Sequence, residues 1–161
     1  MRPKKILVTG ASGFLGGRLV ERLLLAERVP FRAMAHQPGR SMRLARLPVD
    51  IAWCDLTRPE QVASAMEGCD VVVHCAYGAS GMPADNRRVT VDGTRILADA
   101  AVAHGVRRFI HISSVAVYSY TPPLNVTEST PLVRSRDARS TDGLVRRRRG
   151  RGRAGRRGDL R

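Results

Sequence analysis

Apolar residues along this chain alternate between short continuous runs and stretches with helical spacing. The continuous runs predict five strands, at residues 4–10, 31–35, 49–54, 71–75 and 108–114. Apolar positions at i, i+3 and i+4 predict helices at residues 14–27, 59–66 and 84–104, with a helical turn at 44–47. Strands that alternate with helices in this way indicate an α/β fold with a doubly wound parallel sheet.

The alternation of strands and helices stops after Tyr120. Beyond Val133 the sequence consists mainly of Arg, Gly, Ala, Ser and Asp, which bury too little apolar surface to become ordered. We therefore expect one incomplete α/β domain over residues 1–133, with a sheet that stops after about the fifth strand. Residues 134–161 are expected to form a disordered Arg/Gly-rich tail.

The positive charge is concentrated in that tail. The chain carries a net charge of +14, and residues 134–161 contribute 12 arginines and three aspartates to it. Such a segment holds phosphates through counterion release without reading a sequence. The tail contains no aromatic residue on which a base could stack, so nonspecific contact with polyanions is expected rather than a selected nucleic-acid function.

The cysteine content and the apolar runs also indicate where in the cell the protein belongs and whether it binds a metal. The three cysteines, Cys54, Cys69 and Cys75, contain no C-x-x-C pair, which argues against a disulfide framework and against a metal site. No stretch reaches the ~18 apolar residues of a membrane span, and glycines interrupt the apolar run near the N-terminus where a signal peptide would continue. A cytoplasmic protein is the resulting expectation.

The first strand leads into a loop of three glycines and then into a helix that begins at Phe14. Gly10, Gly13 and Gly16 let the backbone approach a ligand closely, and the helix directs unpaired N–H groups and its positive dipole end at the space above the loop. An anionic pyrophosphate suits that position, above Gly10, Ser12, Gly13 and Gly16. The spacing G-x-x-G-x-x-G matches the dinucleotide fingerprint loosely, and a glycine-rich turn without a ligand is the alternative.

The loop Thr-Gly-Ala-Ser-Gly-Phe-Leu-Gly, at residues 9–16, resembles the cofactor loop of the extended short-chain dehydrogenase/reductases, the NAD-dependent epimerase/dehydratase family. The resemblance covers residues 4–133. It implies an NAD(P)-binding Rossmann domain in which Phe14 and Leu15 also contact the cofactor. It further implies a small-molecule substrate, either a sugar nucleotide or a hydroxyl or carbonyl compound, and it leaves the oligomeric state open.

The end of the second strand bears on the choice between NAD and NADP. An acidic residue there binds the 2′-hydroxyl of the NAD ribose, whereas an arginine nearby accommodates the 2′-phosphate of NADP. His36 and Arg40 follow this strand, and no acidic residue occurs before Asp50. The sequence thus favours NADP, with Arg40 as an ordinary solvated loop residue in the alternative interpretation.

The third strand is followed by Asp55-Leu56, which resembles the family's Asp-Leu pair near the adenine. In the alternative interpretation Asp55 caps the helix that begins at Pro59, for which Thr57 is a second candidate cap. In that helix start, Pro59 occupies the first turn, where its missing N–H costs nothing.

The fourth strand ends in His74-Cys75-Ala76-Tyr77, which resembles the family's His-x-Ala-Ala segment on the nicotinamide side. His74 lies within the buried strand and has no second ligand at metal spacing. We therefore interpret it as a core histidine with satisfied hydrogen bonds, not as a catalytic base or metal ligand.

The helix predicted at 84–104 contains Thr90-Val91-Asp92-Gly93-Thr94, which resembles the family's Asn-Val-x-Gly-Thr. Thr90 replaces the asparagine that helps to organise the active site in that family. Gly93 is expected to let the helix pack close to the sheet, because a glycine within a helix costs about 1 kcal/mol relative to alanine and needs such a reason.

Ser113-Ser114-Val115-Ala116-Val117-Tyr118 resembles the family's Ser-Ser-x-x-Val-Tyr signature, which implies that Ser114 polarises the substrate. In the alternative interpretation the serines only cap the strand end. The family's Tyr-x-x-x-Lys pair is absent, because the last tyrosine is Tyr120 and the last lysine is Lys5.

The positions expected for that tyrosine and lysine hold Arg139 and Gly143. An arginine does not donate its proton, because its pKa exceeds 12. We therefore expect no hydride chemistry from this chain. Two alternatives to an enzyme stay open: a non-catalytic dinucleotide-binding module, and a remnant of a truncated or frame-shifted gene that folds poorly.

Overall fold

The computed structural model describes residues 3–26, 29–118 and 125–132. The chain divides into two compact units, Met1–Ile112 and Ser113–Arg161. The disordered tail predicted over 134–161, together with Arg139 and Gly143, lies outside the described residues.

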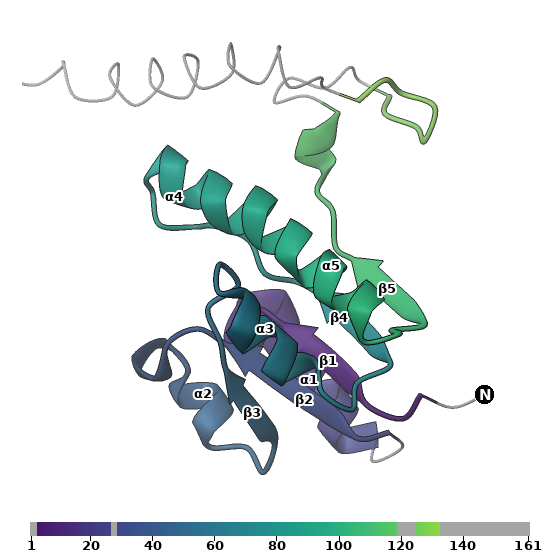
Figure 1. The fold of residues 1–161 in the computed structure, drawn as a ribbon. Coiled ribbons are helices and arrows are strands. Elements are labelled where there is room, and N and C mark those ends of the chain that lie inside the picture. Colours follow the sequence, from purple (N-terminus) through teal and green to yellow (C-terminus); the bar gives the residue numbers. More distant parts are fainter. Residues whose placement is uncertain (1–2, 27–28, 119–124, 133–161) are drawn as a thin grey trace, which may run out of the picture. The chain divides into compact units, whose positions relative to one another are not determined.

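Five strands form one sheet at the centre of the first unit (Figure 1). They are β1 (Ile6–Thr9), β2 (Phe31–Ala35), β3 (Asp50–Trp53), β4 (Val71–His74) and β5 (Arg108–His111). Their order is β3-β2-β1-β4-β5, and all four neighbouring pairs are parallel. This is the Rossmann-like doubly wound sheet that the sequence predicts, with the strand order reversing between β1 and β4.

Helices connect the strands and cover both faces of the sheet (Figure 1). They are α1 (Phe14–Ala26), α2 (Met42–Ala45), α3 (Pro59–Met66), α4 (Pro83–Arg87) and α5 (Thr94–Ala103). Shorter turns are the 3₁₀ turns η1 (Pro38–Arg40) and η3 (Val115–Val117) and the π-helical turn η2 (Arg88–Gly93).

The core consists of two apolar layers, one on each face of the sheet, because successive strand residues point in opposite directions. Leu7 of β1 belongs to the layer that contains side chains of α3 and α5. Its neighbour Val8 belongs to the layer that contains Val20 of α1 and Leu44 of α2. Strand β4 is buried at three of its four residues, as its continuous apolar run predicts.

The helix expected at 84–104 is interrupted by η2, which separates α4 from α5. The apolar spacing of this segment did not predict the π-helical turn. The predicted stop at Gly105 is confirmed. Gly105 has φ +64°, its N–H donates to Val102 O at 3.1 Å, and Val106 N–H donates to Ala101 O at 2.9 Å, which together form a Schellman motif.

The end of the fifth strand and the cap of α3 differ from the prediction. Strand β5 ends at His111 and not at Ser114, because Ser114 instead begins η3, where its Oγ accepts a hydrogen bond from Ala116 N at 3.2 Å. Thr57 does not cap α3. The N-cap is Arg58, without a side-chain cap, while the Thr57 hydroxyl donates to Asp55 Oδ1 at 2.8 Å.

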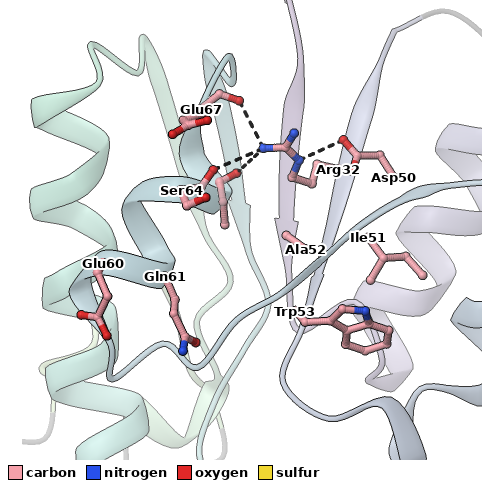
Figure 2. Close-up of a pocket in the computed structure, with 10 residues that line it drawn as sticks. Arg32, Asp50, Ile51, Ala52, Trp53, Glu60, Gln61, Ser64 and Glu67 are labelled. Atoms are coloured by element: carbon pink, nitrogen blue, oxygen red, sulfur yellow. Dashed lines mark hydrogen bonds and ion pairs between the residues drawn. The ribbon is translucent and has the colours of Figure 1, made fainter.

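Arg32 of β2 links the edge strand β3 to the end of α3, beside a cavity of about 450 Å³ (Figure 2). Its guanidinium donates to Asp50 Oδ2 at 2.9 Å and to the carbonyl oxygens of Ala65 and Glu67 at 3.0 and 3.3 Å. Arginine thereby satisfies carbonyls that α3 leaves without partners at its C-terminus. The guanidinium of Arg32 in this cavity is thus engaged in holding the fold together.

At the other end of the sheet, β5 is an edge strand that pairs with β4 alone among the described residues. Ile110 and Ile112 there are each 41% exposed. None of the helices in the described residues has the length and apolar character needed to cross a bilayer.

Cys54, Cys69 and Cys75 are free thiols. Burial raises the pKa of all three, that of Cys54 to about 11. They are therefore protonated and unreactive at neutral pH. Within the described part of the chain, no group of three or more His, Cys, Asp or Glu side chains is arranged to hold a metal ion.

Candidate functional site

The glycine loop turns sharply where β1 ends. Gly10 has φ +64°, a left-handed conformation that favours glycine, and its carbonyl oxygen accepts a hydrogen bond from Gly13 N at 2.9 Å. Ala11 N donates to Met34 O of β2 at 3.2 Å, which holds the loop against the neighbouring strand. The turn is thereby fixed at the carboxyl edge of the sheet.

The same loop is pressed against the first turn of α1. A Cβ atom on Gly16 would overlap the Gly10 carbonyl, and Gly17 N donates to Gly13 O at 2.9 Å. Phe14 and Leu15 are 85% and 49% exposed, so their side chains point away from the core. The first N–H groups of α1, which have no acceptor within the helix, thus lie at the edge of the loop together with the positive end of the helix dipole.

The segment after β4 lies directly against the loop. A Cβ atom on Gly10 would stand 2.7 Å from Ala76 N and 2.8 Å from the carbonyl carbon of Cys75. Only a glycine permits this contact between two backbones. The structure thus brings Gly10 together with the predicted site residues Cys75 and Ala76, followed by Tyr77, which is 70% exposed.

His74 is 1% exposed, and both of its ring nitrogens have partners. Nδ1 lies 2.7 Å from Thr9 Oγ1, and Nε2 lies 2.9 Å from Thr94 Oγ1. Burial, together with the nearby His111, lowers the pKa of His74 to about 4, so the ring is neutral at pH 7. The interpretation of His74 as a core histidine with satisfied hydrogen bonds is confirmed.

The neighbouring hydroxyls determine which nitrogen carries the proton. Thr9 Oγ1 accepts from Ala76 N at 3.3 Å and donates to Nδ1. Thr94 Oγ1 donates to Thr90 O at 2.6 Å, so it accepts from Nε2. We assign the Nε2–H tautomer from this directional chain.

Thr90 holds the segment after β4 from the other side. Its hydroxyl accepts a hydrogen bond from Gly78 N at 2.9 Å, and its carbonyl accepts from Thr94. Thr90 thus fixes the backbone beyond Tyr77 from within the π-helical turn η2. The neighbouring Gly93 contacts Leu56, because a Cβ atom on Gly93 would stand 3.0 Å from Leu56 Cβ. Close packing at Gly93 is confirmed, although the contact is to the loop after β3.

His36 and Asp55 meet where β2 and β3 end, with Nε2 3.6 Å from Oδ2. Burial acts to raise the pKa of Asp55, but hydrogen bonds from the backbone N–H and hydroxyl of Thr57, at 2.9 and 2.8 Å, and the charge of His36 hold it below its usual value. Asp55 therefore stays ionised beside His36. It forms a local turn with Thr57 and does not cap α3.

A smaller cavity of about 180 Å³ lies between α1 and the η1–α2 segment. Ser12, Gly13, Glu21, Ser41 and Arg43 are among the residues that line it. The cavity also includes Gly39, the neighbour of the predicted site residue Arg40.

Sequence analysis missed Glu21 and Arg43 of this cavity. Glu21 Oε1 pairs with Arg43 Nη2 at 2.5 Å, and Glu21 Oε2 pairs with Arg18 Nη1 at 2.9 Å. Hydrogen bonds from Arg18 and Arg43 lower the pKa of Glu21 despite its partial burial. A pair separated by 22 residues leaves no local pattern in the sequence, whereas Arg18 and Glu21 show the i, i+3 spacing of a helical ion pair.

Ser114 belongs to the second unit. It is exposed, and within that unit its Oγ accepts a hydrogen bond from Ala116 N. This is the capping role that the alternative interpretation of the serines expects, although it caps η3 and not a strand. Substrate polarisation by Ser114 stays a prediction.

These features fit a dinucleotide at the carboxyl edge of the sheet. Gly10 and Gly16 allow the loop to pack directly against the segment after β4 and against α1, because a Cβ atom at either position would overlap backbone atoms. An exposed helix N-terminus adds donors for a pyrophosphate. The carboxyl ends of β2, β3 and β4 supply the further predicted site residues: His36, Asp55, Leu56, Cys75, Ala76 and Tyr77.

Comparison with known families agrees with this geometry. The model of the NAD dependent epimerase/dehydratase family matches residues 6–138. The chain is 37% identical over 119 residues to sterol demethylase protein B of Methylococcus capsulatus, which covers 72% of this chain and 36% of that protein. It is 34% identical over 128 residues to 2-alkyl-3-oxoalkanoate reductase of Shewanella oneidensis, which covers 77% of this chain and 32% of that protein.

Among solved structures, a short-chain dehydrogenase/reductase superfamily protein of Agrobacterium tumefaciens with bound NAD is similar, with a TM-score of 0.71 and 33% sequence identity. The match covers 94% of this chain and 46% of that one. The chain thus spans about a third of the length of these curated relatives and less than half of that solved structure.

Proposed function

The chain belongs to the NAD-dependent epimerase/dehydratase family, and from this premise we propose that it binds a nicotinamide dinucleotide along the carboxyl edge of its sheet. One observation carries the proposal. Gly10, at φ +64°, and Gly16 bring the N-terminus of α1 against the end of β1 without any side chain in between. A NAD-bound relative with 33% identity supports the same class of ligand.

Each part of the site has its own role in holding the dinucleotide. The loop Gly10, Ser12, Gly13 and Gly16, with the N–H groups of Phe14 and Leu15, binds the pyrophosphate. Asp55 and Leu56 lie on the adenine side, and Cys75, Ala76 and Tyr77 on the nicotinamide side. When bound, the nicotinamide ring supplies or accepts a hydride.

We assign NADP as the preferred cofactor, with His36 and Arg40 beside the adenosine ribose. No acidic residue lies within β2 or directly after it. Asp55 brings a carboxylate beside His36, but its Oδ1 already accepts two hydrogen bonds from Thr57. Its capacity to accept a ribose 2′-hydroxyl is correspondingly reduced.

At the level of the family, the chemistry is an oxidoreductase, epimerase or dehydratase reaction on a small molecule, a sugar nucleotide or a hydroxyl or carbonyl compound. This chain retains Ser114 to polarise a substrate oxygen but has no Tyr-x-x-x-Lys pair in its sequence. Ser114 alone supplies no group that protonates the substrate at neutral pH. These 161 residues therefore act as a dinucleotide-binding module and not as a complete catalyst.

Titration of the full chain with NADPH and NADH, followed by nicotinamide fluorescence, tests this function. The decisive variant is Gly13→Asp, which places a carboxylate where the pyrophosphate would bind. A Cβ atom at position 13 would stand 3.2 Å from Gly10 O, so the substitution has a steric cost, while an aspartate near a helix N-terminus stabilises the helix by about 0.3–1 kcal/mol. Gly13→Asn has nearly the same volume without the charge and separates repulsion from steric exclusion.

We expect saturable binding to the wild type, weaker binding to Gly13→Asn and no binding to Gly13→Asp. Ligand at 100 times its Kd should also stabilise the wild type by about 2.7 kcal/mol, which a thermal shift detects. A folded wild type that binds neither nucleotide would contradict the proposal. An aggregated wild type without binding would instead support the remnant interpretation.

A further inference from the structure

The larger cavity lies along an unpaired edge of the sheet. In the part of the chain that the structure describes, β3 pairs with β2 alone. Cys54 N donates to Ala35 O at 2.9 Å, which directs the backbone groups of Cys54 toward β2. Because these groups alternate in direction along a strand, those of Ile51 and Trp53 point away from β2, to the open edge. An added strand could form hydrogen bonds with them.

The cavity beside this edge has two chemically different sides (Figure 2). Its volume of about 450 Å³ falls within the ~300–1,000 Å³ that is usual for ligand pockets. Ile51 and Trp53 of β3 form the apolar side, and Trp53 is 44% exposed. Ile51 packs against the apolar layer that contains α1, whereas α3 covers the opposite face of the sheet. The polar side comes from α3 and the residue after it: Glu60, Gln61, Ser64 and Glu67.

The charges that remain available in this cavity are negative. Arg32 is its one basic lining residue, and its guanidinium is already engaged by Asp50 and by carbonyl oxygens at the end of α3. Among the described residues, neither Glu60 nor Glu67 forms an ion pair, and both are exposed. A cationic group that enters the cavity would therefore meet two carboxylates that have no competing partner.

We propose that the groove formed by the edge of β3 and α3 binds an extended basic segment of a partner protein, which adds to β3 as a further strand. The side chains of an added strand alternate between the two faces of the sheet. Arginine or lysine at every second position would lie beside Glu60 and Glu67, and apolar side chains between them would cover Ile51 and Trp53. Main-chain hydrogen bonds supply affinity in this mode of binding, and the side chains supply specificity.

None of the residues assigned to the dinucleotide lines this cavity, so the inference goes beyond the proposed function. The chain's own arginine-rich sequence at residues 146–157 suits only the polar side of the groove. It consists of arginine, glycine and alanine, without a larger apolar residue that could cover Ile51 and Trp53. A partner segment in which basic and apolar residues alternate suits both sides.

The single tryptophan of the chain, Trp53, provides the measurement. The probe is the peptide acetyl-Val-Arg-Val-Arg-Val-Arg-amide, titrated into the full chain at low ionic strength. We expect a saturable shift of the Trp53 emission to shorter wavelength, because the valines of the peptide cover the indole. Hydrogen exchange at the amides of Ile51 and Trp53 should become slower at saturation, since an added strand accepts hydrogen bonds from them.

A peptide of the same composition, acetyl-Arg-Arg-Arg-Val-Val-Val-amide, tests the alternation. It carries the same charge, but its arginines and valines do not separate onto opposite faces of a strand. Because cross-strand pairs each contribute about 0.2–1 kcal/mol, the block peptide should bind roughly threefold or more weakly than the alternating one.

Two double variants test the charges. Glu60→Gln with Glu67→Gln removes the carboxylates of the groove. Asp85→Asn with Asp99→Asn is the matched control, because both aspartates are exposed and lie outside the cavity. Each pair includes one acidic residue from the first turn of a helix, Glu60 in α3 and Asp85 in α4. We expect roughly three- to tenfold weaker binding in the first double variant and a change of less than about twofold in the second.

Absence of a saturable shift would overturn the inference, and so would unchanged hydrogen exchange at Ile51 and Trp53 on saturation. Equal affinity for the two peptides, or equal weakening by both double variants, would reduce the effect to general attraction of charge and overturn it as well. In the absence of peptide, a Trp53 emission that shifts with salt in the wild type but not in the glutamine variant would mean that the chain's own arginines fill the groove, which would overturn the assignment to a partner. Slower exchange at both amides, with weaker binding in the glutamine variant alone, supports the proposal.

Discussion

The hydroxyl of Thr9 lies 2.7 Å from Nδ1 of His74, although 65 residues separate the two in the sequence. Thr9 is the last residue of β1 and His74 the last of β4, and the register of the parallel sheet pairs them directly. The same hydroxyl accepts the N–H of Ala76. A structural hydrogen bond of the core thereby positions the first residues of the candidate nicotinamide side.

Thr9→Val should test this arrangement, because valine keeps the shape of threonine and removes the hydroxyl. Both Ala76 N–H and His74 Nδ1 then lose their partner, and we expect the free energy of unfolding to fall by about 2 kcal/mol. Urea denaturation measures the loss. Hydrogen exchange at the Ala76 amide should become faster in Thr9→Val but not in Thr9→Ser, which retains the donor and acceptor. Unchanged exchange in Thr9→Val would contradict the role of the hydroxyl.

Burial of His74 predicts a loss of stability in mild acid. Its pKa is about 4 in the folded chain against an ordinary value of 6.5, so between these values the unfolded chain binds more protons. Stability should therefore fall as the pH drops from 6.5 towards 4, by about 3 kcal/mol in all, and should be unaffected by this group above 6.5.

Urea denaturation at a series of pH values measures this slope, and His74→Asn provides the comparison, since asparagine does not titrate. We expect the variant to be less stable than the wild type at pH 7, but its free energy of unfolding should change less between pH 4 and 6.5. The aspartates with lowered pKa, Asp50, Asp55 and Asp70, lose their contribution mainly below their ordinary value of 3.8, outside this window, and Glu21, whose ordinary value is 4.5, titrates equally in the wild type and the variant. If the free energy of unfolding changed equally with pH in the wild type and in His74→Asn, a group other than His74 would cause the loss of stability.

Gly10 and Gly105 share a φ of +64° but differ in their surroundings. A Cβ atom on Gly105 would meet nothing within 4 Å, whereas one on Gly10 would stand 2.7 Å from Ala76 N. Gly105→Ala should cost about 1–2 kcal/mol for the left-handed conformation alone. Gly10→Ala should cost a further 1–3 kcal/mol or so for the steric overlap, and it should displace the segment after β4.

Thermal and urea unfolding of the two alanine variants measure that difference, and nucleotide titration shows its effect on the site. We expect Gly105→Ala to bind as the wild type does, because Gly105 lies at the far end of α5. Equal destabilisation by Gly10→Ala and Gly105→Ala would contradict the close approach of Gly10 to Ala76.

The arginine-rich sequence at residues 134–161 predicts binding to polyanions that depends strongly on salt. Affinity for duplex DNA without regard to sequence should be measurable near 50 mM salt and should fall by roughly tenfold or more by 200 mM, because counterions are released on binding. Fluorescence anisotropy with two unrelated DNA sequences measures this. Binding that resists salt, or that prefers one sequence, would indicate a selected nucleic-acid site.

Short sequence motifs predicted those parts of the site whose conformation depends on neighbouring residues alone. The three glycines of the loop, the helix start at Phe14 and the stop at Gly105 each depend on residues within a few positions. Residues at strand ends, such as Asp55 and Ala76, were also predicted to gather at one edge, because parallel strands bring their carboxyl ends together.

The rest depends on partners that only the folded chain brings together. Glu21 and Arg43 lie on different helices, and the Thr9–His74–Thr94 chain joins β1, β4 and α5. Thr57 was expected to cap α3, but Asp55 lies two residues before it and accepts its hydroxyl. The spacing of apolar residues did not distinguish the π-helical turn at Arg88–Gly93 from an α-helix.

The open edge of β5 also has a thermodynamic consequence. Among the described residues β5 pairs with β4 alone, and Ile110 and Ile112 are each 41% exposed, so this edge is a template for another strand. Any strand that adds to β5 in the folded chain, and not in the unfolded one, shifts the folding equilibrium by mass action. The melting temperature of the purified chain should therefore rise with its own concentration wherever that strand comes from a second molecule.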